Sequence, residues 1–137
     1  MDWKTLTDNV LKLSSQITIK PDYIVGIARG GVVPALIIAH HLKVKNYFMI
    51  KIERVGDERK ILADVKVDLT GKKVLIVEDM LETGKTMESA ITYFKNLGAE
   101  VHTACLYVMN KTDIKIDYVL DTIDIIPQFP WEDVLTH

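Results

Sequence analysis

Three carboxylates lie within five residues of this chain, at Glu78, Asp79 and Glu82. They follow the apolar run 74–77 and lead into a Thr-Gly-Lys-Thr loop at 83–86. In an open α/β sheet, the carboxyl end of a strand is where ligands bind. A loop of amides and hydroxyls at a helix N-terminus favours a phosphate group. Sugar hydroxyls and Mg²⁺ would offset the repulsion between these acids and a phosphate.

Two other interpretations of this segment deserve comparison. The triplet at 84–86 also occurs in nucleoside-triphosphate P-loops, but these need a second glycine five residues earlier. Asp79 occupies that position, so the P-loop is excluded. The acids could instead be ordinary solvated side chains before a helix. Three acids directly after an apolar strand, followed by Thr-Gly-Lys-Thr, favour a ligand site.

A second candidate anion site lies at Ala28, Arg29, Gly30 and Gly31, after the apolar run 23–27. A cation beside amides exposed by glycine suits an anionic group. The alternative is a tight turn in which the glycines serve geometry alone. The acidic segment elsewhere in the chain makes the anion site the better interpretation.

Alternating strands and helices must position these loops. Apolar residues at helical spacing predict an amphipathic helix over 3–17. Pro34 is tolerated in the first turn of a second helix over 33–42, and Gly98 closes a third after Thr86. Glu53 to Lys60 is highly charged and is predicted to be a mobile loop. The predicted strands are 23–27, 47–52, 74–77, 101–108 and 118–120. Their continuous apolar runs are typical of a parallel sheet that is covered on both faces.

Length and composition predict one α/β domain over residues 1–137. A formal net charge of −2 argues against a nucleic-acid partner. The one cysteine, Cys105, gives no internal disulfide, and the four histidines show no metal-ligand spacing. No signal-peptide pattern is present, and no apolar stretch approaches the roughly 20 residues that span a bilayer. We therefore expect a soluble cytoplasmic protein without a membrane partner.

Residues 74–86 resemble the phosphoribosyl pyrophosphate (PRPP) motif of type I phosphoribosyltransferases, in the form found in the hypoxanthine-guanine and xanthine-guanine enzymes. The resemblance implies an open, mainly parallel twisted sheet flanked by helices. It also implies that Glu78 and Asp79 hold the ribose hydroxyls and Mg²⁺. The 5′-phosphate would be held by Glu82, Thr83, Gly84, Lys85 and Thr86. Position 82, near the base, is usually aspartate in this family and is glutamate here.

Residues 27–35 resemble the pyrophosphate loop of the same family, which implies that Ala28, Arg29, Gly30 and Gly31 bind pyrophosphate. The peptide before the glycine is often cis in that family. The charged segment 53–60 matches the position of the family's flexible loop, and we expect Arg59 and Lys60 to contact pyrophosphate.

The C-terminal part resembles the base-binding region of the xanthine-guanine enzymes. Lys111 takes the place of the lysine that donates to the exocyclic oxygen of a 6-oxopurine. Residues from about 112 to 137, with the N-terminal segment, would form a small hood. The base-stacking position, usually aromatic, falls on Ile126, and Phe129 is a second candidate for stacking.

The function implied is purine salvage: Mg²⁺-dependent transfer of ribose 5-phosphate from PRPP to hypoxanthine, guanine or xanthine. Asp79, Glu82 and Arg29 are the expected catalytic residues, with Glu82 accepting the base proton through a modestly raised pKa. The resemblance also implies a homodimer or homotetramer. Two alternatives stay open, namely a PRPP-binding regulator without catalysis and transfer to another base.

Overall fold

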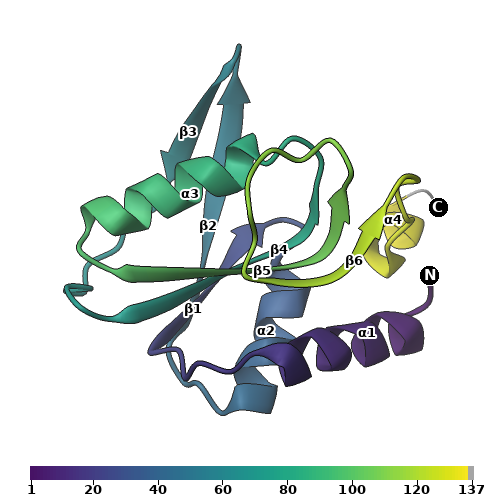
Figure 1. Ribbon diagram of the computed structural model, residues 1–137, viewed down its shortest axis with the longest axis horizontal. Coiled ribbons are helices and arrows are strands. Elements are labelled where there is room, and N and C mark those ends of the chain that lie inside the picture. The colour runs from purple at the N-terminus through teal and green to yellow at the C-terminus, as the bar shows by residue number, and fades with distance from the viewer. Residues whose placement is uncertain (136–137) are drawn as a thin grey trace.

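The computed structural model describes residues 1–135, which form one six-stranded sheet with helices on both faces (Figure 1). The strand order is β3-β2-β1-β4-β5-β6, and all neighbours pair in parallel except the antiparallel β2 and β3. The predicted α/β architecture is confirmed. In chain order the elements are α1 (Trp3–Gln16), β1 (Tyr23–Ala28), α2 (Val32–Leu42), β2 (Tyr47–Val55), β3 (Glu58–Leu62), β4 (Lys73–Leu81), α3 (Lys85–Asn96), β5 (Glu100–Met109), β6 (Tyr118–Ile123) and α4 (Pro130–Leu135).

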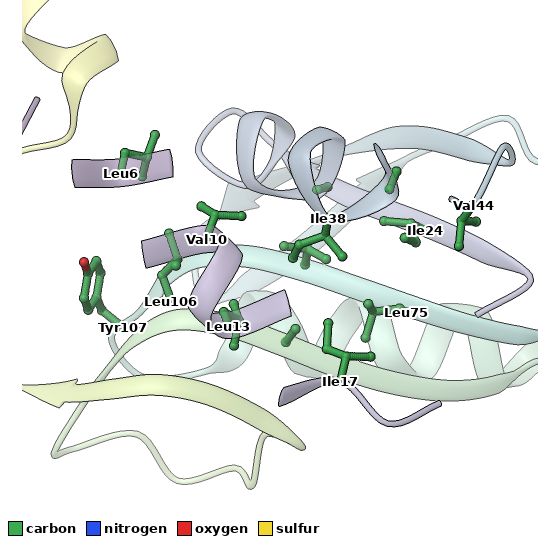
Figure 2. Packing of buried hydrophobic residues seen from close by; sticks show 14 of the residues in the cluster. Leu6, Val10, Leu13, Ile17, Ile24, Ile38, Val44, Leu75, Leu106 and Tyr107 are labelled. Carbon is green, nitrogen blue, oxygen red and sulfur yellow. The ribbon is translucent and has the colours of Figure 1, made fainter. Parts of the chain in front are cut away.

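Helices α1 and α2 cover one face of the sheet. The carboxylate of Asp2 caps α1 by accepting from the amide of Thr5 at 2.8 Å. Leu6, Val10 and Leu13 follow at helical spacing and are fully buried. Figure 2 shows how they pack against α2 and the central strands.

Helix α3 covers the opposite face. Its buried side chains, Met87, Ala90 and Phe94, join a second core with the central strands. The two cores explain why β1, β4 and β5 are apolar along nearly their whole length, since both faces of each strand are covered.

The segment 53–60, predicted to be a mobile loop, is instead a β-hairpin. Strands β2 and β3 pair in register from Lys51 with Leu62 to Val55 with Glu58, and Gly56 turns with a φ of +63°. Charged residues obscured the strand signal because the hairpin projects from the sheet, so most of its side chains meet solvent (Figure 1).

Strand β6, which lies in the region predicted to form a hood, belongs to the main sheet, and both β6 and the tail after it pack against α1. The terminal amine of Met1 donates to the carbonyl of Gln128 at 3.1 Å, and the rings of Trp3 and Trp131 lie 6.2 Å apart. Helix α4 was not predicted, because its 6 residues are too few to show the hydrophobic periodicity of a helix. Within residues 1–135, no helix has both the length and the apolar character needed to cross a membrane.

Candidate active site

The loops that follow β1, β4 and β5 meet at one edge of the sheet, because these three parallel strands are neighbours. They are the Arg29-Gly30-Gly31 loop, the loop between β4 and α3, and the segment that begins at Asn110. The sequence-predicted residues of all three loops therefore come together at the carboxyl ends of the strands, where α/β sheets bind ligands.

Glu78 and Asp79 lie within β4, which continues four residues beyond its predicted end at Val77. Successive strand residues point to opposite faces. Accordingly, Glu78 lines a cavity of about 230 Å³ that also includes Thr83, Gly84 and Thr86. Asp79 lines a separate cavity of about 750 Å³. The two acids thus divide the site into two compartments.

Burial raises the pKa of both carboxyls above their ordinary values. Glu78 is 8% exposed, and its pKa lies well above the usual range because of burial and the neighbouring Asp79. Burial also raises the pKa of Asp79, to which the nearby Glu132 adds a smaller contribution. Neither acid has an ion-pair partner among the side chains that the structure describes.

These properties fit a cation that arrives with the ligand. Within residues 1–135, no group of three or more His, Cys, Asp or Glu side chains is arranged to hold a metal alone. Mg²⁺ commonly uses one or two carboxylates and takes its other oxygens from substrate phosphates and water. Asp79 and Glu78 are the residues that would hold it.

The smaller cavity has the features of a phosphate cradle. Gly84 has a φ of +91° and directly precedes α3, so its loop lies at a helix N-terminus, where backbone amides favour an anion. Thr86 accepts from Nε of Arg59 at 3.3 Å, which brings a cation from β3 to the cradle. Lys85, expected here, instead lines an outer groove between the hairpin and α3.

The larger cavity is lined by Ala28, Arg29 and Gly30, and the Ala28–Arg29 peptide is cis, one residue before the peptide that directly precedes Gly30. A Cβ on Gly31 would lie 2.4 Å from the carbonyl oxygen of Val77, and one on Gly30 would overlap the Asp79 carboxylate. Both glycines are therefore required by close approach to β4. Side chains that were not singled out from the sequence also line this cavity, among them Trp3, Met49 and Glu132. Nothing local in the sequence marked them, since they reach the cavity from distant elements.

Glu82 and Lys111 form an ion pair at 2.8 Å between the loops that follow β4 and β5. The structure therefore brings the two predicted base-site residues together. The expectation of a raised pKa for Glu82 is wrong. Its carboxylate is exposed, and the hydrogen bond and charge of Lys111 lower its pKa.

Arg59 and Lys60 do not point the same way. They are adjacent in β3, so Arg59 faces the cradle while Lys60 is exposed. Arg59 was expected to contact pyrophosphate beside the Arg29 loop. It instead lines the smaller cavity, next to the 83–86 loop.

The two predicted stacking residues of the tail have different surroundings. Phe129 is 1% exposed and packs between Tyr107 and Trp131, with the Trp131 ring stacked on it at 4.8 Å. Its ring belongs to the core, so no face is free for a base, and the expected stacking contact is corrected. Ile126 is 53% exposed and follows the carboxyl end of β6.

Comparisons with known proteins agree with this arrangement. The family model described as a phosphoribosyl transferase domain matches residues 2–134. An orotate phosphoribosyltransferase 2 from Mesorhizobium japonicum is 31% identical over 123 residues, which are 87% of this chain and 61% of the relative. A xanthine-guanine phosphoribosyltransferase from Ruegeria sp. is 29% identical over 129 residues, covering 83% of this chain and 70% of the relative. The chain thus spans less than two thirds of the orotate enzyme's length.

Among solved structures, a purine phosphoribosyltransferase from Pyrococcus horikoshii superposes with a TM-score of 0.88 at 34% identity, over 96% of this chain and 91% of that one. The chain belongs to the phosphoribosyltransferase family, and it is a type I member close to the 6-oxopurine enzymes.

Proposed function

We propose that this protein transfers ribose 5-phosphate from PRPP to a 6-oxopurine and releases pyrophosphate, with Mg²⁺ as cofactor, in cytoplasmic purine salvage. One observation carries the proposal: the buried Glu78 and the half-buried Asp79 of β4 face two separate compartments, each bordered by a glycine-containing loop. PRPP has the matching form, with a 5′-phosphate on one side of the ribose and a pyrophosphate on the other.

In the proposed reaction, a base nitrogen attacks the anomeric carbon of the ribose while the bond to pyrophosphate breaks. Arg29 and the amides of its loop receive the charge on the leaving group, and the 83–86 loop fixes the 5′-phosphate. Glu78 and Asp79 orient the ribose hydroxyls and tolerate the positive charge that develops on the ring. Bound Mg²⁺ would supply further charge stabilisation at the pyrophosphate.

Arg59 is assigned in this proposal to the 5′-phosphate rather than to pyrophosphate. Its hydrogen bond to Thr86 places the guanidinium at the cradle. It is also the one Lys or Arg among the residues that line the smaller cavity. A phosphate dianion there would sit beside Glu78 and Glu82, so a neighbouring cation is needed to offset their charge.

Lys111 is the basis for proposing a 6-oxopurine. Its ammonium group has donors and no acceptor. It therefore complements the exocyclic oxygen of hypoxanthine, guanine or xanthine, whereas the amino group of adenine offers a second donor. When that oxygen engages Lys111, Glu82 would be released to accept the proton that leaves the base nitrogen.

The experiment is to incubate the protein with Mg²⁺, PRPP and single bases while following pyrophosphate release. Hypoxanthine, guanine, xanthine, adenine and orotate form the panel. We expect release with at least one 6-oxopurine and none with adenine. Lys111→Ala should lose most of the activity, while Lys115→Ala, at another exposed lysine, should keep it. Release with adenine, or an active Lys111→Ala variant, would contradict the assignment of the base.

A PRPP-binding regulator without catalysis is the second candidate. The observation in its favour is that Glu82 is engaged by Lys111 with a lowered pKa, which makes it a poor proton acceptor. Tight binding of PRPP with no release of pyrophosphate for any base would support the regulator, and release with orotate alone would indicate a pyrimidine enzyme.

A further inference from the structure

The segment after β5 packs against the back of the phosphate cradle. The hydroxyl of Thr112 lies 2.6 Å from the carbonyl oxygen of Glu82 and 3.2 Å from that of Leu81. The amide of Asp113 lies 3.4 Å from the carbonyl oxygen of Thr83. The one hydroxyl hydrogen of Thr112 is therefore within reach of two carbonyls, of which that of Glu82 is the nearer, and the amide of Asp113 reaches a third.

The same segment also covers Gly84. A Cβ at Gly84 would lie 2.8 Å from Ile114 and 3.3 Å from the methyl group of Thr112. None of Thr112, Asp113 or Ile114 lines the smaller cavity, so the segment lies behind the loop and the cavity in front of it.

This placement determines which way the loop amides point. The peptides that join residues 82 to 84 are trans. In a trans peptide, the C=O and the following N–H point in opposite directions. Because the carbonyls of Glu82 and Thr83 are held towards the segment behind, the amides of Thr83 and Gly84 are directed away from it, towards the cavity. Consecutive amides with this orientation form an anion-binding concavity.

We propose that Thr112 is a positioning residue for the 5′-phosphate: by holding the carbonyl of Glu82, its hydroxyl turns the loop amides towards the bound phosphate. The inference rests on the proposed function, since it assigns the ligand of the smaller cavity. Thr112 itself does not touch the ligand. Lys111 is the preceding residue, so the segment that carries the base contact also supports the phosphate contact.

The test compares two ligands that occupy different compartments, ribose 5-phosphate and pyrophosphate, by titration calorimetry with Mg²⁺. Thr112→Val keeps the shape and removes the hydroxyl, and Thr112→Ser keeps the hydroxyl. We expect the Val variant to bind ribose 5-phosphate about five- to tenfold more weakly, since one net hydrogen bond is lost. Its affinity for pyrophosphate should stay within about twofold of the wild type. The Ser variant should restore the affinity for ribose 5-phosphate.

Thr92→Val, at an exposed threonine of α3, is the matched control and should bind both ligands as the wild type does. Unchanged ribose 5-phosphate binding by Thr112→Val, equal weakening of both ligands, or a Ser variant as weak as the Val variant would overturn the inference. If Thr112→Val does not fold, Thr112→Ala removes the same hydroxyl and the same outcomes apply. A wild type that binds neither ligand would instead refute the proposed function itself.

Discussion

At the scale of single residues, the charge of Asp79 is the property most closely tied to the proposed chemistry. Asp79→Asn keeps the shape and removes the charge, so turnover should be nearly abolished. The melting temperature should be unchanged or higher, because a buried carboxylate without a paired cation is costly. The checks are pyrophosphate release across a Mg²⁺ titration and a thermal melt. Asp64→Asn, at an exposed aspartate, is the control. Wild-type turnover by Asp79→Asn would refute the role of the acid.

The raised pKa values of Glu78 and Asp79 predict opposite pH effects on stability and on ligand binding. At low pH both acids are protonated in folded and unfolded chains alike. As the pH rises from their ordinary pKa through the raised pKa, the unfolded chain loses these protons first, so this contribution lowers the free energy of unfolding. Mg²⁺ and PRPP favour the ionised acids, so binding should strengthen over the same range and release protons.

Calorimetry of PRPP binding in two buffers with different ionisation enthalpies measures that proton release. We expect net release in the wild type and less in Asp79→Asn. Proton uptake, or the same release in both proteins, would show that the acids do not face the ligand.

At the scale of elements, the β2–β3 hairpin directs Arg59 and Lys60 to different sides, because successive side chains of a strand point in opposite directions. Arg59→Ala should raise the apparent dissociation constant for PRPP about tenfold or more, since a charge-assisted hydrogen bond is worth about 1.5–3 kcal/mol. Lys60→Ala should bind PRPP as the wild type does, because Lys60 is exposed. Equal effects of the two substitutions would mean that the hairpin acts through its net charge rather than through Arg59.

The central elements could be predicted from the sequence because their signals are local. Buried strands give unbroken apolar runs, and the third helix, predicted after Thr86, is present as α3 with its start two residues earlier, at Lys85. The hairpin and α4 could not be predicted in the same way. The first is a projecting element with few buried side chains, and the second is too short for periodicity.

The same distinction applies to the site. Its acids and glycines lie in contiguous motifs, so the sequence identified them. The positions of Phe129, Thr112 and the Glu82–Lys111 pair depend on contacts with residues that lie 22 to 31 positions away in the chain. No local pattern encodes such contacts, which is why Phe129 was assigned to the base and Thr112 was missed.

At the scale of the whole molecule, the C-terminal tail packs against α1 and the end of β5, which brings the two ends of the chain together. Phe129 is the centre of this contact. Phe129→Ala should lower the free energy of unfolding by about 3–5 kcal/mol, because it leaves a cavity in the core. Ile125→Ala, at a side chain that is 85% exposed, should change it by less than about 0.5 kcal/mol. Chemical denaturation measures both, and a small effect at Phe129 would show that the tail is not part of the core.

The central claim is that the two compartments flanking β4 are two parts of one PRPP site. Competition calorimetry with Mg²⁺ tests it directly, by titrating PRPP into protein that already holds ribose 5-phosphate, pyrophosphate or both. We predict that each ligand alone weakens PRPP binding, that the two bind together, and that both together weaken it most. PRPP binding that neither ligand affects, or no PRPP binding at all, would contradict the assignment of this site.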